Sequence, residues 1–193
     1  MNYTMQLSYL PFWFFETKKM AELLLDGLDK KEIMELSLDD NIFQLNSERR
    51  RKEIVNTLFK RLDGFSDELL EKFLQVDTDS ARFFVLVSIL KNDMLFFEFI
   101  REVFRDHMIL GNFKLENSDF EIFFENKAMQ SEKVANWQEV TLKKLKSGYK
   151  TILRESNLLI EDDMFSIPFI DLDLKAMLLN ENYGAFIEAI FVN

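Results

Sequence analysis

The stretch Thr78–Lys91, with the sequence TDSARFFVLVSILK, decides the fold. From Phe83 to Leu90 it places apolar side chains on every side of a helix, interrupted by Ser88 alone. A helix that is apolar all round is buried, because any exposed side would put hydrocarbon in water. The stretch is far shorter than the ~20 residues that a bilayer-spanning helix needs. It therefore predicts a central helix that other helices surround.

Apolar residues recur at helical spacing on both sides of this stretch. The sequence predicts further helices over Glu16–Asp26, Asp29 to about Leu36, Ser47–Leu62, Ser66 to about Leu74, Asp93 to about His107, Ser118–Lys127 and Asn136 to about Glu155. Ser118 with Glu121, and Asn136 with Glu139, have the spacing of a capping box. The predicted fold class is all-α, a compact multi-helix bundle.

The tail has a different pattern from the rest of the chain. Leu158–Ile160 and Phe165–Phe169 flank two aspartates, which predicts a short β-hairpin, and Pro168 restricts its second strand to an edge. Asp171 and Asp173 are expected on the wet face of a short strand or extended tail, and one or two short helices should fill the remainder up to Asn193. The predicted organisation is a helical domain over 1–157 and an appendage over 158–193 that packs on it.

The composition excludes several classes of protein. The chain has 193 residues with only 5 Gly and 2 Pro, too few turn residues for a barrel or sandwich of many short strands. It has no Cys and a single His, His107, which argues against disulfide scaffolds, thiolate or histidine metal sites and His-based catalysis. Carboxylates are plentiful, but none is marked out as a general acid/base pair. We expect no metal, no cofactor, no enzymatic activity, no membrane segment and a cytoplasmic location.

Charge is distributed unevenly along the chain. The net charge is −10, yet Ser47–Leu62 carries +4 and Val134–Glu155 carries +3. In the later helix, cations recur every three or four residues from Lys143 to Arg154, which places them in one stripe. In the earlier helix, Arg49 to Arg51 lie in the first turn, where cations oppose the helix dipole. Phosphate binding would explain cations at such a position.

These two basic helices supply the candidate DNA-binding residues. They are Arg49, Arg50, Arg51, Lys52, Lys60, Arg61, Lys143, Lys144, Lys146, Lys150 and Arg154. The alternative is that both stripes are ordinary solvated helix faces, neutralised by acidic neighbours. Phosphate binding by both helices together requires that they converge into one electropositive ridge, and contact with ~4–7 phosphates would give a log–log salt slope of roughly −4 to −6.

Other conspicuous residues are more typical of structure than of chemistry. The 21 phenylalanines cluster at core spacing within acidic helices, which favours packing over base stacking. Trp13 and Phe14 are expected to staple onto the first helix, although an exposed docking surface is the alternative. Trp137 is expected to seal the entry of the helix that follows it, and His107 to lie at a helix C-terminus, where a cation is favourable.

The order of several short motifs resembles the BrxA family of the bacterial BREX phage-defence systems. The resemblance is carried by Tyr3, Thr4 and Leu7, by Glu16, Thr17, Met20, Ala21, Leu23, Leu24, Leu25 and Gly27, by Asn41, Gln44, Ser47 and Arg51, by Ala81, Arg82, Glu98, Phe99, Glu102 and Val103, and by Trp137, Lys144, Leu145, Ile152, Leu153, Glu155, Leu158 and Leu159. It covers roughly residues 3–160. The Phe-rich, acidic composition and the tail after Ile160 depart from the family pattern.

This resemblance implies a NusB-like helical protein that binds double-stranded DNA without catalysis and works beside other BREX components. The alternative is a protein–protein adaptor subunit of the defence complex that does not touch DNA. A metal-dependent nuclease that uses the abundant carboxylates is the third class. The oligomeric state and any base preference do not follow from the sequence.

Overall fold

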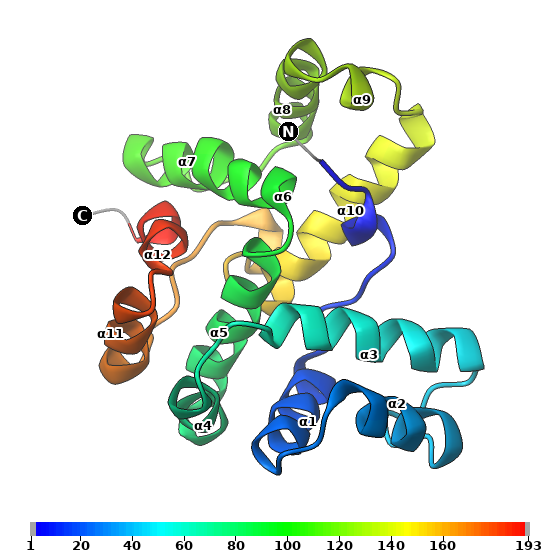
Figure 1. The fold of residues 1–193 in the computed structure, drawn as a ribbon. Helices are drawn as coiled ribbons and strands as arrows, with labels where there is room; N and C mark the ends of the chain where they lie inside the picture. Colours follow the sequence, from blue (N-terminus) through cyan, green and yellow to red (C-terminus); the bar gives the residue numbers. More distant parts are fainter. Residues whose placement is uncertain (1–2, 192–193) are drawn as a thin grey trace.

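The computed structural model describes residues 3–191, which form a helical bundle (Figure 1). Its elements in chain order are η1 (Gln6–Ser8), α1 (Phe14–Leu25), α2 (Lys30–Asp39), α3 (Glu48–Leu62), α4 (Asp67–Gln75), α5 (Thr78–Leu90), α6 (Met94–Phe99), η2 (Ile100–Phe104), α7 (Arg105–Leu110), α8 (Asn117–Gln130), α9 (Glu132–Ala135), α10 (Glu139–Glu155), η3 (Glu161–Asp163), α11 (Leu172–Asn180) and α12 (Gly184–Ile190). No sheet forms within the described residues, which confirms the all-α prediction.

Helix α5 is the centre of the bundle, as its apolar sequence predicts. Every side chain from Phe83 to Leu90 is buried, Ser88 included. The hydroxyl of Ser88 donates to the carbonyl of Val85, so this polar group of α5 is paired inside the core. Helices α1, α3, α4, α6 and α12 all pack on α5, so elements from both ends of the chain share one core.

The long helix after α5 is continuous over α6, η2 and α7, with one π-helical stretch in the middle. Asp93 caps it by accepting the backbone N–H of Phe96, as predicted. The helix ends at Leu110, three residues beyond the predicted His107, because Gly111 supplies the left-handed conformation (φ 69°) that terminates it. His107 therefore lies inside the last turn rather than at its end.

Two helix starts were predicted at the wrong residue. Helix α8 begins after Glu116, whose carboxylate forms a capping box with Asp119 in place of the predicted Ser118 and Glu121. Helix α10 begins after Gln138, because the predicted cap Asn136 instead closes the short helix α9. Glu is an uncommon N-cap residue, so the usual N-cap preferences do not predict that α8 begins after Glu116.

The tail forms only traces of the predicted hairpin. Leu159 and Phe165 make an isolated antiparallel bridge, and Met164 makes a second one with Lys114 rather than with the opposite arm. Asp171 caps α11 by accepting the N–H of Leu174, so it does not lie on a strand. The two short helices predicted for the tail are present: α11 packs on α4 and α12 on α5 and η2. The division at residue 158 stays a prediction, and the predicted end at Asn193 lies outside the described residues.

One lysine is fully buried and carries its charge into the core. Lys127 on α8 is 2% exposed, and its ammonium lies 2.7 Å from carboxylates of both Glu98 and Glu102 on the long helix. The hydroxyl of Tyr3 donates to the same Glu98 carboxylate at 2.7 Å. This network ties the start of the described chain and α8 to one carboxylate.

We predict that Lys127→Met lowers the free energy of unfolding by about 3–5 kcal/mol, because Glu98 then stays buried without its cation. Urea denaturation measures the loss. The control is Lys31→Met, which breaks an exposed pair with Glu35 and should change stability by less than about 0.5 kcal/mol. The double variant Lys127→Met/Glu98→Gln should recover part of the loss. A cost below about 1 kcal/mol for Lys127→Met would refute this interpretation.

Candidate nucleic-acid interface

Helix α3 presents one apolar and one basic side, as its sequence predicts. Ser47 caps it, and Ile54, Val55, Leu58 and Leu62 are buried against the core. Helices α1, α2 and α5 pack on this apolar side. The opposite side leaves Arg49, Lys52, Asn56 and Lys60 exposed at steps of three and four residues.

Two of α3's arginines bind backbone carbonyls inside the protein. Arg51 donates to the carbonyls of Leu38 and Leu45 at 2.9 and 3.0 Å, which closes the loop between α2 and α3. Arg61 is 3% exposed and donates to the carbonyls of Phe12 and Pro11 at 2.9 and 3.0 Å. Burial lowers the pKa of Arg61 to about 10, so it remains charged at neutral pH. Their guanidinium groups therefore stabilise the fold.

Helix α10 also uses two of its cations internally. Lys150 and Arg154 both contact the carboxylate of Asp163 in η3, at 2.6 and 2.5 Å. The hydrogen bond from Lys150 holds the pKa of Asp163 below its usual 3.8. Asp163 and its neighbour Asp162 both adopt φ 56°, which turns the chain back towards α10. The aspartates predicted to form a hairpin tip thus neutralise the end of the lysine stripe.

The remaining candidates are exposed or nearly so. Lys52 and Lys143 form exposed pairs with Glu48 and Glu139 one turn earlier, which are weak and salt-sensitive contacts. Five candidates have no carboxylate within ion-pair distance among the described residues. They are Arg49, Arg50, Lys60, Lys144 and Lys146. Lys146 instead lies over the ring of Phe120, 5.6 Å from its centroid.

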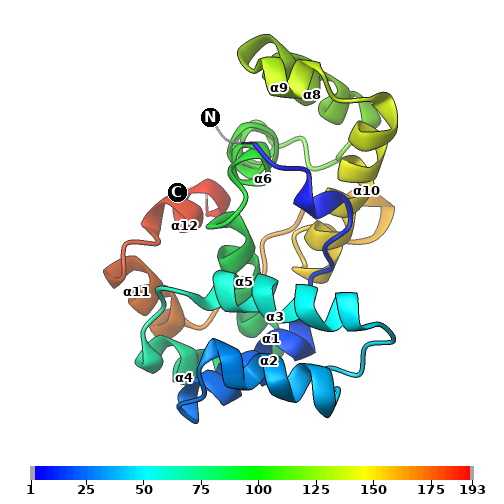
Figure 2. The ribbon, with the colours of Figure 1, turned by 45° about the vertical axis from the view of Figure 1, so that its right-hand side comes forward.

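The N-terminal segment, residues 3–13, lies between the two basic helices (Figures 1 and 2). On one side, a hollow of about 200 Å³ separates it from α3 and is lined by Asn56 and Lys60. On the other side, a groove of about 300 Å³ separates it from α10 and is lined by Lys144. Leu7 and Leu10 line both spaces, so one short segment forms the floor between α3 and α10.

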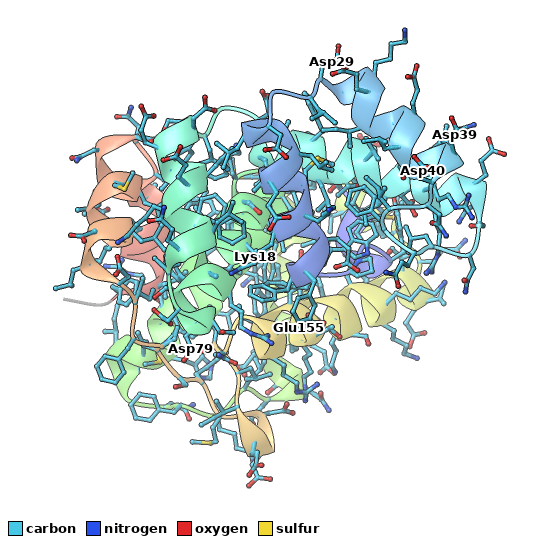
Figure 3. All side chains as sticks on the ribbon, turned by 90° about the horizontal axis from the view of Figure 1, so that it is seen from below. Lys18, Asp29, Asp39, Asp40, Asp79 and Glu155 are labelled. Carbon is cyan, nitrogen blue, oxygen red and sulfur yellow. The ribbon has the colours of Figure 1, made fainter. Side chains whose placement is uncertain are left out.

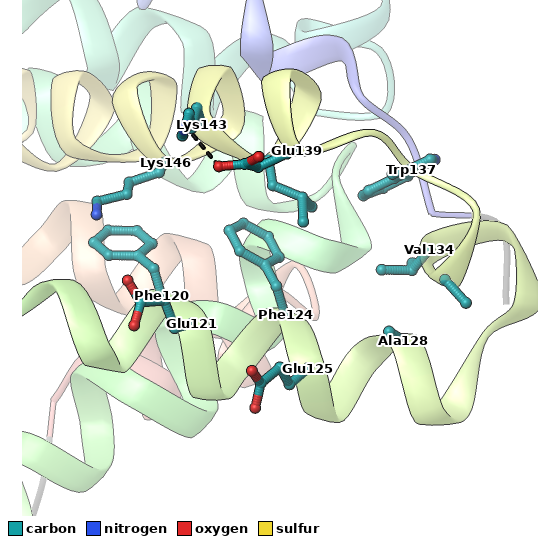
Figure 4. A pocket seen from close by; sticks show the side chains of 12 residues that line it. Phe120, Glu121, Phe124, Glu125, Ala128, Val134, Trp137, Glu139, Lys143 and Lys146 are labelled. Carbon is teal, nitrogen blue, oxygen red and sulfur yellow. Dashed lines mark ion pairs between the residues drawn. The ribbon is translucent and has the colours of Figure 1, made fainter.

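The side of α10 that faces this segment is not the predicted lysine stripe. Lys144, Ser147 and Thr151 line the groove beside the segment. Lys143 and Lys146 instead line a separate hollow against α8 (Figure 4), about a quarter turn or more around the helix. Lys144 therefore lies on the side of α10 that faces the N-terminal segment and α3. The predicted stripe of Lys143, Lys146, Lys150 and Arg154 lies on a different side of α10.

Gly148 allows the N-terminal segment to lie directly against α10. A Cβ added at Gly148 would be 1.9 Å from the carbonyl oxygen of Leu7. This contact was not anticipated from the sequence, although a glycine inside a helical pattern is a signal of close backbone approach. Ser8, Tyr9, Ser147 and Thr151, which surround the contact, are further site residues that charge patterns do not reveal.

The other conspicuous residues are structural. Phe14 is buried and Trp13, the N-cap of α1, is half-buried with Arg61 over its ring, so these two residues do not form an exposed docking surface, and the staple onto α1 stays a prediction. His107 lies between Asp119 and the carbonyl of Asn112. Within the described residues, no three His, Asp or Glu side chains are placed to hold a metal ion. No helix in that part of the chain is long and apolar enough to cross a membrane.

Comparison with known proteins agrees with the resemblance in sequence. An uncharacterized protein from Magnetospirillum magneticum, known from its crystal structure, has the same fold: its TM-score is 0.85 over 100% of both chains, with 21% identity. The chain is thus a helical-bundle protein in which the N-terminal segment lies between two basic helices, α3 and α10. The BrxA family model matches residues 1–182, and the BREX protein BrxA of Bacillus cereus (strain H3081.97) is 44% identical over 149 residues, 77% of this chain and 74% of the relative.

The chain belongs to the BrxA family of the BREX phage-defence systems. The match to residue 182 includes most of the tail, so the family pattern extends beyond the predicted limit at Ile160. Helix α11 and most of the segment that connects it to α12 therefore lie within the part of the chain that the family model matches.

We predict that Gly148→Ala lowers stability, although an exposed helical Gly→Ala change usually raises it by about 1 kcal/mol. The added methyl group displaces the carbonyl of Leu7 and with it the N-terminal segment. Thermal and urea unfolding measure the effect, with Ser147→Ala on the same turn as the control. A stabilised Gly148→Ala variant would show that the segment does not rest on α10.

We predict that Asp163→Asn destabilises the protein at pH 7 and that its deficit shrinks as the pH falls. The depressed pKa of Asp163 means that its contribution is present above about 3.8 and is lost as the carboxylate protonates. The matched control is Asp162→Asn, since both residues have φ 56° and gain equally from asparagine's tolerance of that conformation. Equal stability of the two variants at pH 7 would contradict the assigned ion pairs.

Proposed function

We propose that this member of the BrxA family is a non-enzymatic subunit that binds double-stranded DNA through phosphate contacts. The observation that carries the proposal is the set of cations left without a carboxylate partner on both sides of the N-terminal segment. Arg49, Arg50 and Lys60 lie on α3, and Lys144 lies on α10. Two of these cations, Arg49 and Arg50, lie in the first turn of α3, where the helix dipole disfavours positive charge. Because an acidic protein has many carboxylates that could pair with them and does not use them, we infer that these cations bind an external anion.

The remaining charge favours one orientation on the DNA. Figure 3 labels three aspartates at the ends of α2: Asp29 is its N-cap, Asp39 its last residue and Asp40 its C-cap. A duplex approaching from that side would be repelled. We therefore propose that the cations beside the N-terminal segment form the face that meets the phosphates, and the counterions released at these contacts make binding sensitive to salt.

Few of these contacts read sequence. The exposed groups are cations and hydroxyls, which position a protein on the phosphate backbone without distinguishing bases. We therefore propose binding with little base preference, in support of the other BREX components.

A protein–protein adaptor is the second candidate, and one observation favours it. Phe15 is 77% exposed beside a hollow of about 530 Å³ between α1 and the loop before α3, lined also by Ile42, Phe43 and Leu45. The polar side chains of Glu16, Lys19 and Gln44 line the hollow as well, and an exposed aromatic beside such a mixed lining is typical of protein contacts. The adaptor surface would use Phe15 rather than Trp13 and Phe14, which pack internally. Both roles are compatible on one chain, because the two faces are different.

We predict that the log–log salt slope of duplex DNA binding is about −4, from about four or five neutralised phosphates. Fluorescence anisotropy with a labelled duplex between 50 and 200 mM KCl measures it. Arg49→Gln/Arg50→Gln should make the slope shallower by about 2 and weaken binding at low salt.

The matched control removes the same charge from α10. Lys150→Gln/Arg154→Gln should make the slope shallower by less than Arg49→Gln/Arg50→Gln does, because Asp163 pairs with both cations and cancels one of their two charges. Binding without salt dependence would refute the proposal. Equal shifts in both double variants would show that net charge, rather than a defined face, governs the interaction.

A further inference from the structure

The groove between the N-terminal segment and α10 differs in chemistry from the other hollows of the described chain. Its polar lining consists of Ser8, Tyr9, Lys144, Ser147 and Thr151, and no carboxylate lines it. Each of four other hollows contains at least one carboxylate, although the chain has 34 acidic residues among its 193. A groove with one cation, four hydroxyl groups and no acid is suited to an anion.

The fold aligns these donors on one side of α10. Lys144, Ser147 and Thr151 follow each other at steps of three and four residues, so their side chains project together. Thr151 donates to the carbonyl of Ser147 at 3.0 Å, whereas the hydroxyls of Ser8 and Ser147 have no hydrogen-bond partner in the described part of the protein. Gly148 lets the N-terminal segment approach closely enough for Ser8 to face this row.

We propose that this groove binds one backbone phosphate of duplex DNA. Lys144 supplies the opposing charge, and Ser8 and Ser147 donate to the non-bridging oxygens. A phosphodiester carries a single negative charge, which matches a groove with a single cation. Tyr9, 58% exposed at the edge, lies where the adjacent sugar would pass. The inference rests on the proposed DNA binding and adds a specific phosphate site that the basic stripes did not indicate.

The site also explains how α10 contributes to a face shared with α3. The groove and the hollow beside Lys60 share Leu7 and Leu10 as their floor. A phosphate in the groove is therefore separated from Lys60 of α3 only by the N-terminal segment. One duplex can contact both sides of that segment, as hydroxyl and ammonium donors commonly do along a phosphate backbone.

The test separates the charged donor from the neutral ones. Lys144→Gln should weaken duplex binding and make the salt slope shallower by about 1, since one counterion fewer is released. Ser8→Ala/Ser147→Ala should weaken binding about 3- to 10-fold with an unchanged slope, because hydroxyls release no counterion. The matched controls are Lys31→Gln on α2 and Ser118→Ala on α8, both exposed and expected to bind as the unmodified protein does.

Chemical-shift titration of the Ser147 and Gly148 amides distinguishes duplex DNA from free phosphate. Duplex should shift these amides at concentrations that saturate binding, and inorganic phosphate at equal ionic strength should not. A response to inorganic phosphate alone would overturn the proposal. Unmodified protein that binds DNA, with groove variants equal to the controls, would overturn the groove while leaving the proposed function. Absence of DNA binding by the unmodified protein would overturn both.

Discussion

The hydrogen bonds from Arg61 to the carbonyls of Pro11 and Phe12 hold the N-terminal segment in place, and the arrangement of the basic helices depends on that segment. A buried guanidinium costs desolvation energy, and it is tolerated here because carbonyl oxygens accept its hydrogens. On the opposite side, the absence of a side chain at Gly148 admits the backbone at Leu7. Tyr3 and Thr4 fix the start of the segment through Glu98 and Asp93. Helix α10 thus meets the backbone of the segment directly, whereas α3 holds the segment through the side chain of Arg61.

The cations of the two basic helices divide into structural and available groups according to what lies opposite each one. Arg51 and Arg61 bind carbonyls, and Lys150 and Arg154 share Asp163. Arg49, Arg50, Lys60 and Lys144 form no ion pair among the described residues, although Lys60 lines the same hollow as Asp93. A sum of charges along the chain treats these groups alike. Their contributions to the external field differ, because paired charges largely cancel at the distance of a ligand.

The sequence predicts features that depend on neighbouring residues and misses those that depend on distant ones. The all-round apolar run in α5 and the cap at Ser47 are local, and both were correct. The partner of Arg61 lies about fifty residues away, and Asp163 reaches α10 only because two successive aspartates adopt a left-handed conformation. The start of α8 was missed because Glu116 is an unusual cap. The exposed side of α3 could therefore be predicted, whereas the separation of the α10 stripe from it could not.

The position of the N-terminal segment sets an order on the assembly of the protein. Residues 3–13 emerge from the ribosome before all of the helices on which they pack. Helix α10, which contacts them on one side, is synthesised well over a hundred residues later. Until then Leu7 and Leu10 have no complete apolar environment, and loop closure over such a separation is entropically slow. The face that we assign to DNA therefore comes into existence at a late step of folding.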